Sequence, residues 1–257
     1  MLKILYEDNH LIGAVKPAGF LSQGDGGSAP DMLSAVGTFL AGKYNKPGKA
    51  FVGLVHRLDR NVGGTMIFAK TSKGASRASE DIREGFFYKG YFALTGGEPC
   101  GGAEGFMRHR LEKNPKENRV YLSANGKECV LYYRKICDFN DLSGAGRSVY
   151  FVIPLTGRAH QIRAQFALSG APLAGDAKYG GSGADNGPER QIGLWSSFLS
   201  VRKTTDRSGR IWLSSLPEGT IWLDGRGVLP AEIASFAGSG MPLALFESVK
   251  RKTGDLK

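Results

Sequence analysis

One short stretch of the chain places a single carboxylate between two guanidinium groups. It covers residues 56–60, with Arg57 and Arg60 on either side of Asp59, and it leads into a glycine-containing segment. An aspartate is ionised at neutral pH, and flanking cations favour the anion further. Asp59 could therefore act as a nucleophile or as a base. An aspartate in a loop also serves as a cap or in a surface ion pair, and this stretch alone leaves those roles open.

Two further polar segments could take part in chemistry. Residues 156–163 lie at the start of an expected helix, where His160 and Arg163 have the i, i+3 spacing that puts two side chains on one helical face. Such a face at a helix start suits phosphate or carboxylate binding, although a capping or core histidine fits the pattern equally well. The turn-rich segment 175–181 contains Asp176, which suits an Asx turn as much as a site.

The elements that must position these segments form a mixed α+β pattern. Short apolar runs bounded by turn residues predict strands, and apolar residues at helical spacing predict helices. The predicted strands cover residues 2–6, 11–15, 51–55, 65–69, 88–94, 120–122, 130–136, 149–154, 192–195, 198–201, 210–213 and 220–223. The predicted helices cover residues 31–44, 72–84, 159–169 and 242–252. Asn125-Gly126 predicts a hairpin between strands 120–122 and 130–136.

Composition restricts the class of protein. The chain has 257 residues, 41% hydrophobic and 23% charged, which excludes a mainly disordered, fibrous or membrane-embedded protein. Its 34 Lys and Arg against 24 Asp and Glu give a formal charge of +10, which favours a polyanionic partner such as nucleic acid. The 3 cysteines show no CxxC spacing, so neither a disulfide framework nor a zinc site is indicated. Without a signal peptide or a bilayer-spanning run, we expect a cytoplasmic protein with reduced thiols.

In combination and order, these segments resemble the RluA-type family of RNA pseudouridine synthases. The matching segments are 4–11, 16–19, 56–59, 89–91, 156–163 and 175–180, and the resemblance extends to about residue 223. It implies a single catalytic domain over residues 1–257, with room for two lobes that share one sheet. The implied fold is α+β, with a mixed, mostly antiparallel central sheet flanked by helices and loops. The implied reaction converts specific uridines of ribosomal or transfer RNA to pseudouridine, with no cofactor and no metal.

The resemblance also assigns roles to individual residues. Asp59 matches the catalytic aspartate, Tyr91 the active-site tyrosine that can stack on uracil, and Arg163 the arginine that pairs with the aspartate. A uracil inside a helix cannot be reached by a carboxylate, so base flipping is implied, and Arg57 matches the residue that enters the vacated stack. The other expected RNA contacts are His56, Arg60, Lys89, Arg158 and His160. We expect a monomer with no membrane partner, and without the N-terminal RNA-binding domain of many relatives.

One departure from the family pattern keeps alternatives open. Where the family usually has Thr-Ser-Gly after its aspartate motif, this chain has Val62-Gly63-Gly64, which removes hydroxyls that commonly brace the loop. An RNA-binding or ribosome-assembly factor with a vestigial site is therefore the main alternative, although Asp59, Tyr91 and Arg163 are all retained. A hydrolase that releases free uracil would need a paired carboxylate, and the motifs contain none.

Overall fold

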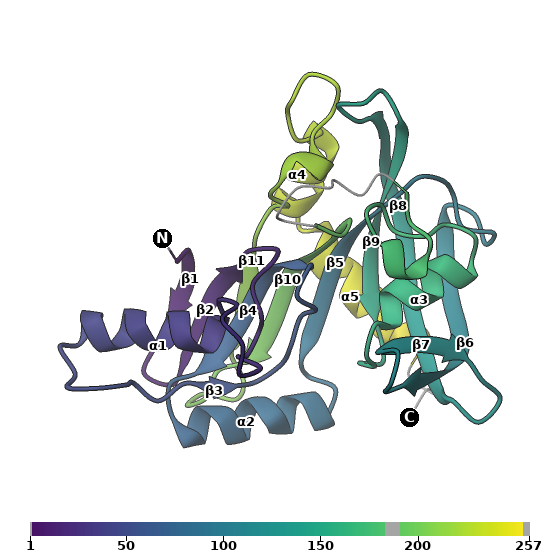
Figure 1. Cartoon of the computed structure of the whole chain (residues 1–257). Helices are drawn as coiled ribbons and strands as arrows, with labels where there is room; N and C mark the ends of the chain where they lie inside the picture. The colour runs from purple at the N-terminus through teal and green to yellow at the C-terminus, as the bar shows by residue number, and fades with distance from the viewer. Residues whose placement is uncertain (1, 183–190, 254–257) are drawn as a thin grey trace. The chain divides into compact units, whose positions relative to one another are not determined.

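The computed structural model describes residues 2–182 and 191–253, and the chain divides into two compact units. Unit 1 comprises residues 1–89 and 196–215, and unit 2 comprises residues 90–195 and 216–257. Each unit combines antiparallel strands with helices (Figure 1). The expectation of one catalytic domain over the whole chain stays a prediction.

Unit 1 is built on antiparallel strands from two separate parts of the chain. They are β1 (Ile4–Glu7), β2 (Leu11–Lys16), β3 (Gly53–Leu54), β4 (Gly63–Ala69), most of β10 (Leu194–Arg202), and β11 (Arg210–Ser214). β2 pairs with β1 and β4, β3 pairs with β4, and β11 pairs with β10. The predicted N-terminal hairpin is confirmed. The predicted strand 51–55 is reduced to β3, and the two predicted strands 192–195 and 198–201 are the single strand β10.

Two capped helices belong to unit 1, as their sequences predict. α1 (Met32–Lys43) begins after Asp31, whose side chain accepts a hydrogen bond from the Ser34 N–H, and α2 (Ser72–Arg83) begins after Thr71, which accepts from the Gly74 N–H. These side chains satisfy N–H groups that the first helical turn leaves unpaired. The apolar core of this unit includes Leu11, Ile67, Ala78, Leu199, Ile211 and Leu213.

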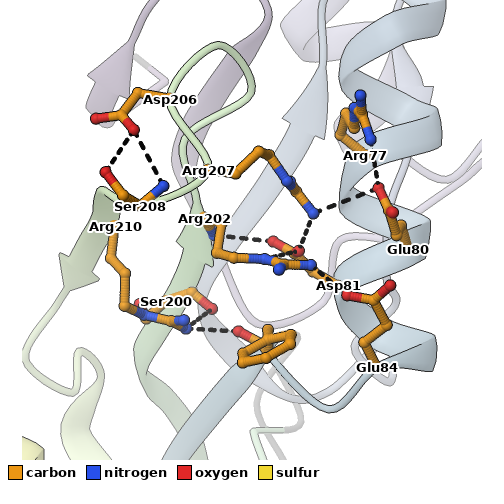
Figure 2. Close-up of polar contacts among 11 residues, drawn as sticks. Arg77, Glu80, Asp81, Glu84, Ser200, Arg202, Asp206, Arg207, Ser208 and Arg210 are labelled. Atoms are coloured by element: carbon orange, nitrogen blue, oxygen red, sulfur yellow. Dashed lines mark hydrogen bonds and ion pairs between the residues drawn. The ribbon is translucent and has the colours of Figure 1, made fainter.

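A buried ion-pair network joins α2 to the β10–β11 hairpin in unit 1 (Figure 2). The Asp81 carboxylate is fully buried, and it accepts hydrogen bonds from Arg202 Nε at 2.6 Å and from the Arg202 backbone N–H at 2.8 Å. Arg207 Nη2 donates to the same carboxylate at 2.6 Å, and Arg202 also pairs with Glu84 on the helix surface. Asp81 therefore pairs with two arginines and links the hairpin to the helix.

We expect Asp81→Ala to lower the free energy of unfolding by roughly 3 to 5 kcal/mol, because it leaves part-buried arginines without their carboxylate. Urea denaturation followed by circular dichroism measures this loss. Glu84→Ala is the matched control, since its half-exposed side chain pairs with the same Arg202, and its loss should stay below about 1 kcal/mol. Equal losses in the two variants would contradict the assignment of Asp81 as the anchor.

Unit 2 contains an antiparallel sheet in the order β5 (Tyr88–Thr95), β9 (Gly146–Pro154), β8 (Lys127–Asn140), β6 (Glu104–Asn114) and β7 (Arg119–Leu122). The first two residues of β5 belong to unit 1. The pairs β5–β9, β9–β8, β8–β6 and β6–β7 are all antiparallel. The predicted fold class, α+β with a mostly antiparallel sheet, is confirmed.

The predicted hairpin through Asn125-Gly126 is wrong. β7 and β8 both pair with β6, a strand that the sequence pattern did not indicate, so β6 lies between them. The dipeptide does lie in a turn that connects β7 to β8, but these two strands lie on opposite sides of β6 and do not pair with each other. A Cβ atom at Gly126 would lie 2.6 Å from the Leu111 backbone, so the position requires glycine for a close crossing of two backbones.

The helices of unit 2 agree with the sequence pattern only in part. They are α3 (Gln161–Leu168), η1 (Ala177–Tyr179), η2 (Thr220–Trp222), α4 (Ala231–Gly238) and α5 (Met241–Lys252). The predicted strand 220–223 is wrong, because this segment is the 3-10 turn η2. α4 was not predicted; its Phe236 ring packs 4.9 Å from the Phe151 ring, which gives the sheet an aromatic cover.

Two properties concern the described part of the chain as a whole. None of the helices in residues 2–182 and 191–253 is long and apolar enough to cross a membrane. In the same residues, no group of three or more His, Cys, Asp and Glu side chains is placed to hold a metal ion. Cys100, Cys129 and Cys137 are free thiols.

Candidate active site

Asp59 lies in the loop that joins β3 to β4 in unit 1. Its side chain is partly exposed, and the flanking Arg57 and Arg60 are exposed. The Asp59 carbonyl accepts a hydrogen bond from the Val62 N–H at 3.1 Å, which closes a tight turn after the carboxylate. The loop thus carries one partly exposed anion between two exposed cations, which suits a reactive carboxylate that meets an anionic partner.

Lys16, at the end of β2, holds the second half of this loop. Its side chain is fully buried, and its Nζ donates to the carbonyls of Arg60 at 2.9 Å, Val62 at 2.8 Å and Pro17 at 3.0 Å. Burial lowers the pKa of the Lys16 amine to about 7, and the negative charge of Asp59 opposes this shift. The sequence motifs include Lys16 but gave no indication that it binds the loop.

Ser22 holds the first half of the loop. Its hydroxyl accepts a hydrogen bond from the Leu58 N–H at 2.9 Å and donates to the Leu58 carbonyl at 2.8 Å. The residues on either side of Asp59 are therefore fixed by buried side chains from an earlier part of the chain. These contacts brace a loop in which Val62 and Gly63 have no side-chain hydroxyl.

Gly64, directly after the loop, is required by its surroundings. Its φ angle is +123°, and a Cβ atom there would lie 2.3 Å from the carbonyl oxygen of Ser196 in β10. No other residue type can adopt this backbone conformation and approach without strain. The end of the Asp59 loop is thus set by close contact between two backbones.

His56, at the start of the loop, is buried in unit 1. Its Nε2 accepts a hydrogen bond from the Ile67 N–H at 3.2 Å, and its ring lies 5.2 Å from the Phe87 ring. Burial lowers the pKa of His56 to about 3, and the positive charge of Lys89 adds to the shift. The ring is therefore neutral at physiological pH and supports the loop from inside. Burial also lowers the pKa of Lys89.

Unit 2 carries the remaining candidate residues. Tyr91 is a buried residue of β5, opposite Val152 in the register of β9, and Arg158 is exposed in the loop before α3. Arg163 is buried in α3. Unit 1 therefore contains Asp59, His56, Arg57, Arg60 and Lys89, and unit 2 contains Tyr91, Arg158, His160 and Arg163.

His160 lies outside the helix that contains Arg163, so the two do not share a helical face, although both side chains contact Tyr179. His160 has a left-handed backbone with φ 49°, so α3 begins only at Gln161. The imidazole is instead 3.0 Å from the Tyr179 hydroxyl through Nδ1, and the two rings meet edge to face. Sequence spacing could not show this, because a residue directly before a helix follows no helical periodicity.

Comparison with known proteins places the chain in a family. The family of RNA pseudouridylate synthases matches residues 10–168, a region that includes the Asp59 loop, Tyr91 and Arg163. The chain belongs to this family, and the RluA-type resemblance of its motifs is confirmed.

The chain is similar in sequence to several curated pseudouridine synthases. The chain is 34% identical over 183 residues to ribosomal large subunit pseudouridine synthase C of Rickettsia felis, covering 69% of this chain and 55% of the relative. It is 33% identical over 185 residues to ribosomal large subunit pseudouridine synthase D of Xylella fastidiosa, covering 70% of this chain and 52% of the relative. The chain thus matches about half the length of these curated relatives.

Solved structures support the fold. Human RNA pseudouridylate synthase domain containing 1 aligns with a TM-score of 0.64 at 20% identity, covering 85% of this chain and 84% of that chain. Human RNA pseudouridylate synthase domain containing 4 aligns with a TM-score of 0.63 at 21% identity, covering 83% and 87%. At these identities the likeness concerns the fold alone.

Proposed function

We propose that this protein is an RNA pseudouridine synthase that isomerises specific uridines, with Asp59 as its catalytic residue. The observation that supports this most directly is the Asp59 loop itself. It lies within the region matched by the family, and Lys16 and Ser22 hold it on both sides of the carboxylate. A loop fixed in this way suits a reacting group that must meet its target in one geometry.

The proposed reaction rearranges one nucleotide without redox chemistry. The bond from ribose C1′ to uracil N1 breaks, the uracil turns, and C5 bonds to C1′. The C5 hydrogen then leaves as a proton, and N1 gains a proton. Asp59 either adds to the nucleotide or assists base departure and proton removal, and both routes fit its place in the loop. The isomerisation requires no metal or organic cofactor.

Other residues have supporting roles in this proposal. We assign to Arg163 and Tyr91 the roles that the family resemblance implies, which are pairing with the Asp59 carboxylate and stacking on the uracil. The target base is flipped out of its helix, and Arg57 enters the vacated stack. The exposed guanidinium groups of Arg60 and Arg158 contact the RNA backbone, whose binding should weaken as salt concentration rises. We propose that the protein acts as a cytoplasmic monomer with one catalytic domain.

The names of the relatives suggest where to look for the substrate. Several act on the ribosomal large subunit by name, so we propose large-subunit ribosomal RNA as the first RNA to test, with transfer RNA second. The bracing of the Asp59 loop argues against a vestigial site, because a binding factor has no need for a fixed carboxylate.

Tritium release tests this function. Unmodified ribosomal and transfer RNA are transcribed with uridine labelled at C5, and the wild-type protein is added. We expect release of tritium to water and a new pseudouridine peak after digestion to nucleosides. Free uracil instead of pseudouridine would identify a hydrolase. Salt-sensitive RNA binding without tritium release from either RNA would favour the RNA-binding or ribosome-assembly factor.

A further inference from the structure

Asp176 is a buried carboxylate in unit 2 that the proposed reaction does not use. Its side chain is 1% exposed, and both of its oxygens accept hydrogen bonds from Arg163. Nε of Arg163 donates to Oδ2 at 2.7 Å, and Nη2 donates to Oδ1 at 2.8 Å. Two parallel bonds of this length form the bidentate pairing that fixes the plane of a guanidinium group. The pair is buried on both sides, since the Arg163 side chain is 8% exposed.

The backbone around Asp176 is itself held in place. Its N–H donates to the Leu173 carbonyl at 3.1 Å, and its carbonyl accepts from the Tyr179 and Gly181 N–H groups. Gly175, directly before it, has φ +71°, and a Cβ atom there would lie 2.4 Å from the Gln191 carbonyl oxygen. The backbone that carries the Asp176 carboxylate is therefore rigid, and a rigid carboxylate can hold the Arg163 guanidinium in one orientation.

Tyr179 packs against the face of the same guanidinium group. The Arg163 Cζ atom is 5.2 Å from the centroid of the Tyr179 ring, within the range of a cation–π contact. The Tyr179 hydroxyl accepts a hydrogen bond from the Val120 N–H at 2.8 Å, which anchors the ring to β7. Arg163 is thus held along one edge by Asp176 and over one face by Tyr179.

This geometry decides between the two sequence interpretations of Asp176. An Asx-turn former uses its side-chain oxygen to accept from the backbone of its own turn. In the described residues, the side-chain hydrogen bonds of Asp176 go to Arg163 instead. Two of the five N–H bonds of the Arg163 guanidinium are occupied by this pairing, and the other three point in directions that the pairing fixes.

We propose that Asp176 is a positioning residue, which orients the Arg163 guanidinium so that it can pair with the proposed catalytic aspartate, Asp59. This inference rests on the proposed function, because it assumes that Arg163 pairs with Asp59. Without Asp176 the guanidinium rotates among several rotamers, and the ionised aspartate meets its partner only part of the time. The rate of isomerisation then falls, while RNA affinity, which depends on exposed cations elsewhere, is retained.

Single-turnover tritium release tests this proposal with Asp176→Asn and Asp176→Glu. We expect Asp176→Asn to reduce the single-turnover rate at saturating protein by about 10- to 100-fold, with the RNA dissociation constant within about twofold of wild type. Asp176→Glu should recover part of the rate, because it keeps the carboxylate. Asp138→Asn is the control, since Asp138 forms an exposed ion pair with Lys135 in the same unit, and its rate should equal that of wild type. An unchanged rate in Asp176→Asn overturns the proposal.

A double-mutant cycle with Arg163→Lys separates positioning from general structural support. A lysine cannot form the bidentate pair, so Asp176→Asn should have almost no additional effect on the rate in the Arg163→Lys background. An equal fold-loss in both backgrounds would show that Asp176 acts only through the stability of the fold and would overturn the proposal.

A readout independent of activity separates this inference from the proposed function. In protein labelled with ¹⁵N-arginine, the Arg163 Nε–H resonance is assigned by its loss in Arg163→Lys. We expect this N–H to exchange slowly with water in wild type and much faster in Asp176→Asn. Loss of this protection with no tritium release from wild type would support the positioning contact while rejecting the function. Equal exchange in the two proteins would reject the contact itself.

Discussion

Asp59→Asn is expected to reduce pseudouridine formation by at least about 1,000-fold, because it removes the negative charge and the carboxylate oxygen that acts as nucleophile or base in the proposed reaction. Asparagine has nearly the same shape, and the loop is held through Leu58, Arg60 and Val62 rather than through the carboxylate alone. RNA affinity should therefore stay within about twofold of wild type. Single-turnover tritium release and filter binding on the same RNA measure the two quantities.

Asp25→Asn provides the matched control for this prediction. Asp25 is an exposed loop aspartate of unit 1 whose carboxylate accepts a hydrogen bond from the Gly27 N–H, so the same chemical change there should leave the rate unaltered. Turnover by Asp59→Asn within tenfold of wild type would contradict a catalytic role for this residue. Loss of RNA binding together with turnover would show instead that the carboxylate holds the loop in shape.

Much of the fold could be predicted because local signals agree with the final structure. The helices predicted over residues 31–44 and 72–84 form as α1 and α2, each within one residue of those bounds. β6 gave no such signal. Burial does alternate along β6, but the inward positions beside Met107 and Leu111 hold Gly105 and His109, so the apolar alternation expected of a half-buried strand is not visible in the sequence. Which strand lies between β7 and β8 depends on long-range pairing, which a turn dipeptide does not specify.

Short apolar runs were ambiguous for a different reason. Residues 220–223 have the composition of a strand, yet Gly219, with φ +107°, leads into a 3-10 turn that buries Trp222. A run of four residues contains too little periodicity to distinguish these structures, so tertiary packing of one large side chain determines the result.

The candidate site also has residues that the sequence motifs identify and residues that only the structure identifies. Asp59, Tyr91 and Arg163 belong to motifs that can be recognised in the sequence. The residues that hold them cannot be recognised in this way, because their partners are distant or are backbone atoms. Lys16 binds the backbone carbonyls of Arg60 and Val62, which lie 44 and 46 positions later in the chain. Every residue has a carbonyl, so the sequence does not indicate which one a side chain binds. Asp176 was visible, but only the structure shows that it faces Arg163 rather than its own turn.

Lys16→Met carries the second large expected effect. The substitution keeps the approximate length of the side chain and removes three hydrogen bonds to buried or part-buried carbonyls, two of them in the Asp59 loop. Each unpaired acceptor costs about 1 to 3 kcal/mol, and burial of a methionine instead of an amine offsets part of this. We expect the free energy of unfolding to fall by roughly 2 to 4 kcal/mol and the single-turnover rate to fall by about 100-fold, since a displacement of about 1 Å in a reacting group has an effect of this size.

Lys70→Met separates these two effects. Lys70 is a partly buried lysine of unit 1, with hydrogen bonds to the Glu7 carboxylate at 2.6 Å and to the Asp8 carbonyl at 2.7 Å, and neither partner belongs to the Asp59 loop. Its replacement should also lower the free energy of unfolding but leave the rate of the folded enzyme unchanged. Urea denaturation and tritium release at a temperature where both variants are folded make the comparison. A similar loss of rate in both variants would mean that Lys16 serves the stability of unit 1 in general. A loss confined to Lys16→Met would show that the Lys16 hydrogen bonds to Arg60 and Val62 set the position of the Asp59 carboxylate.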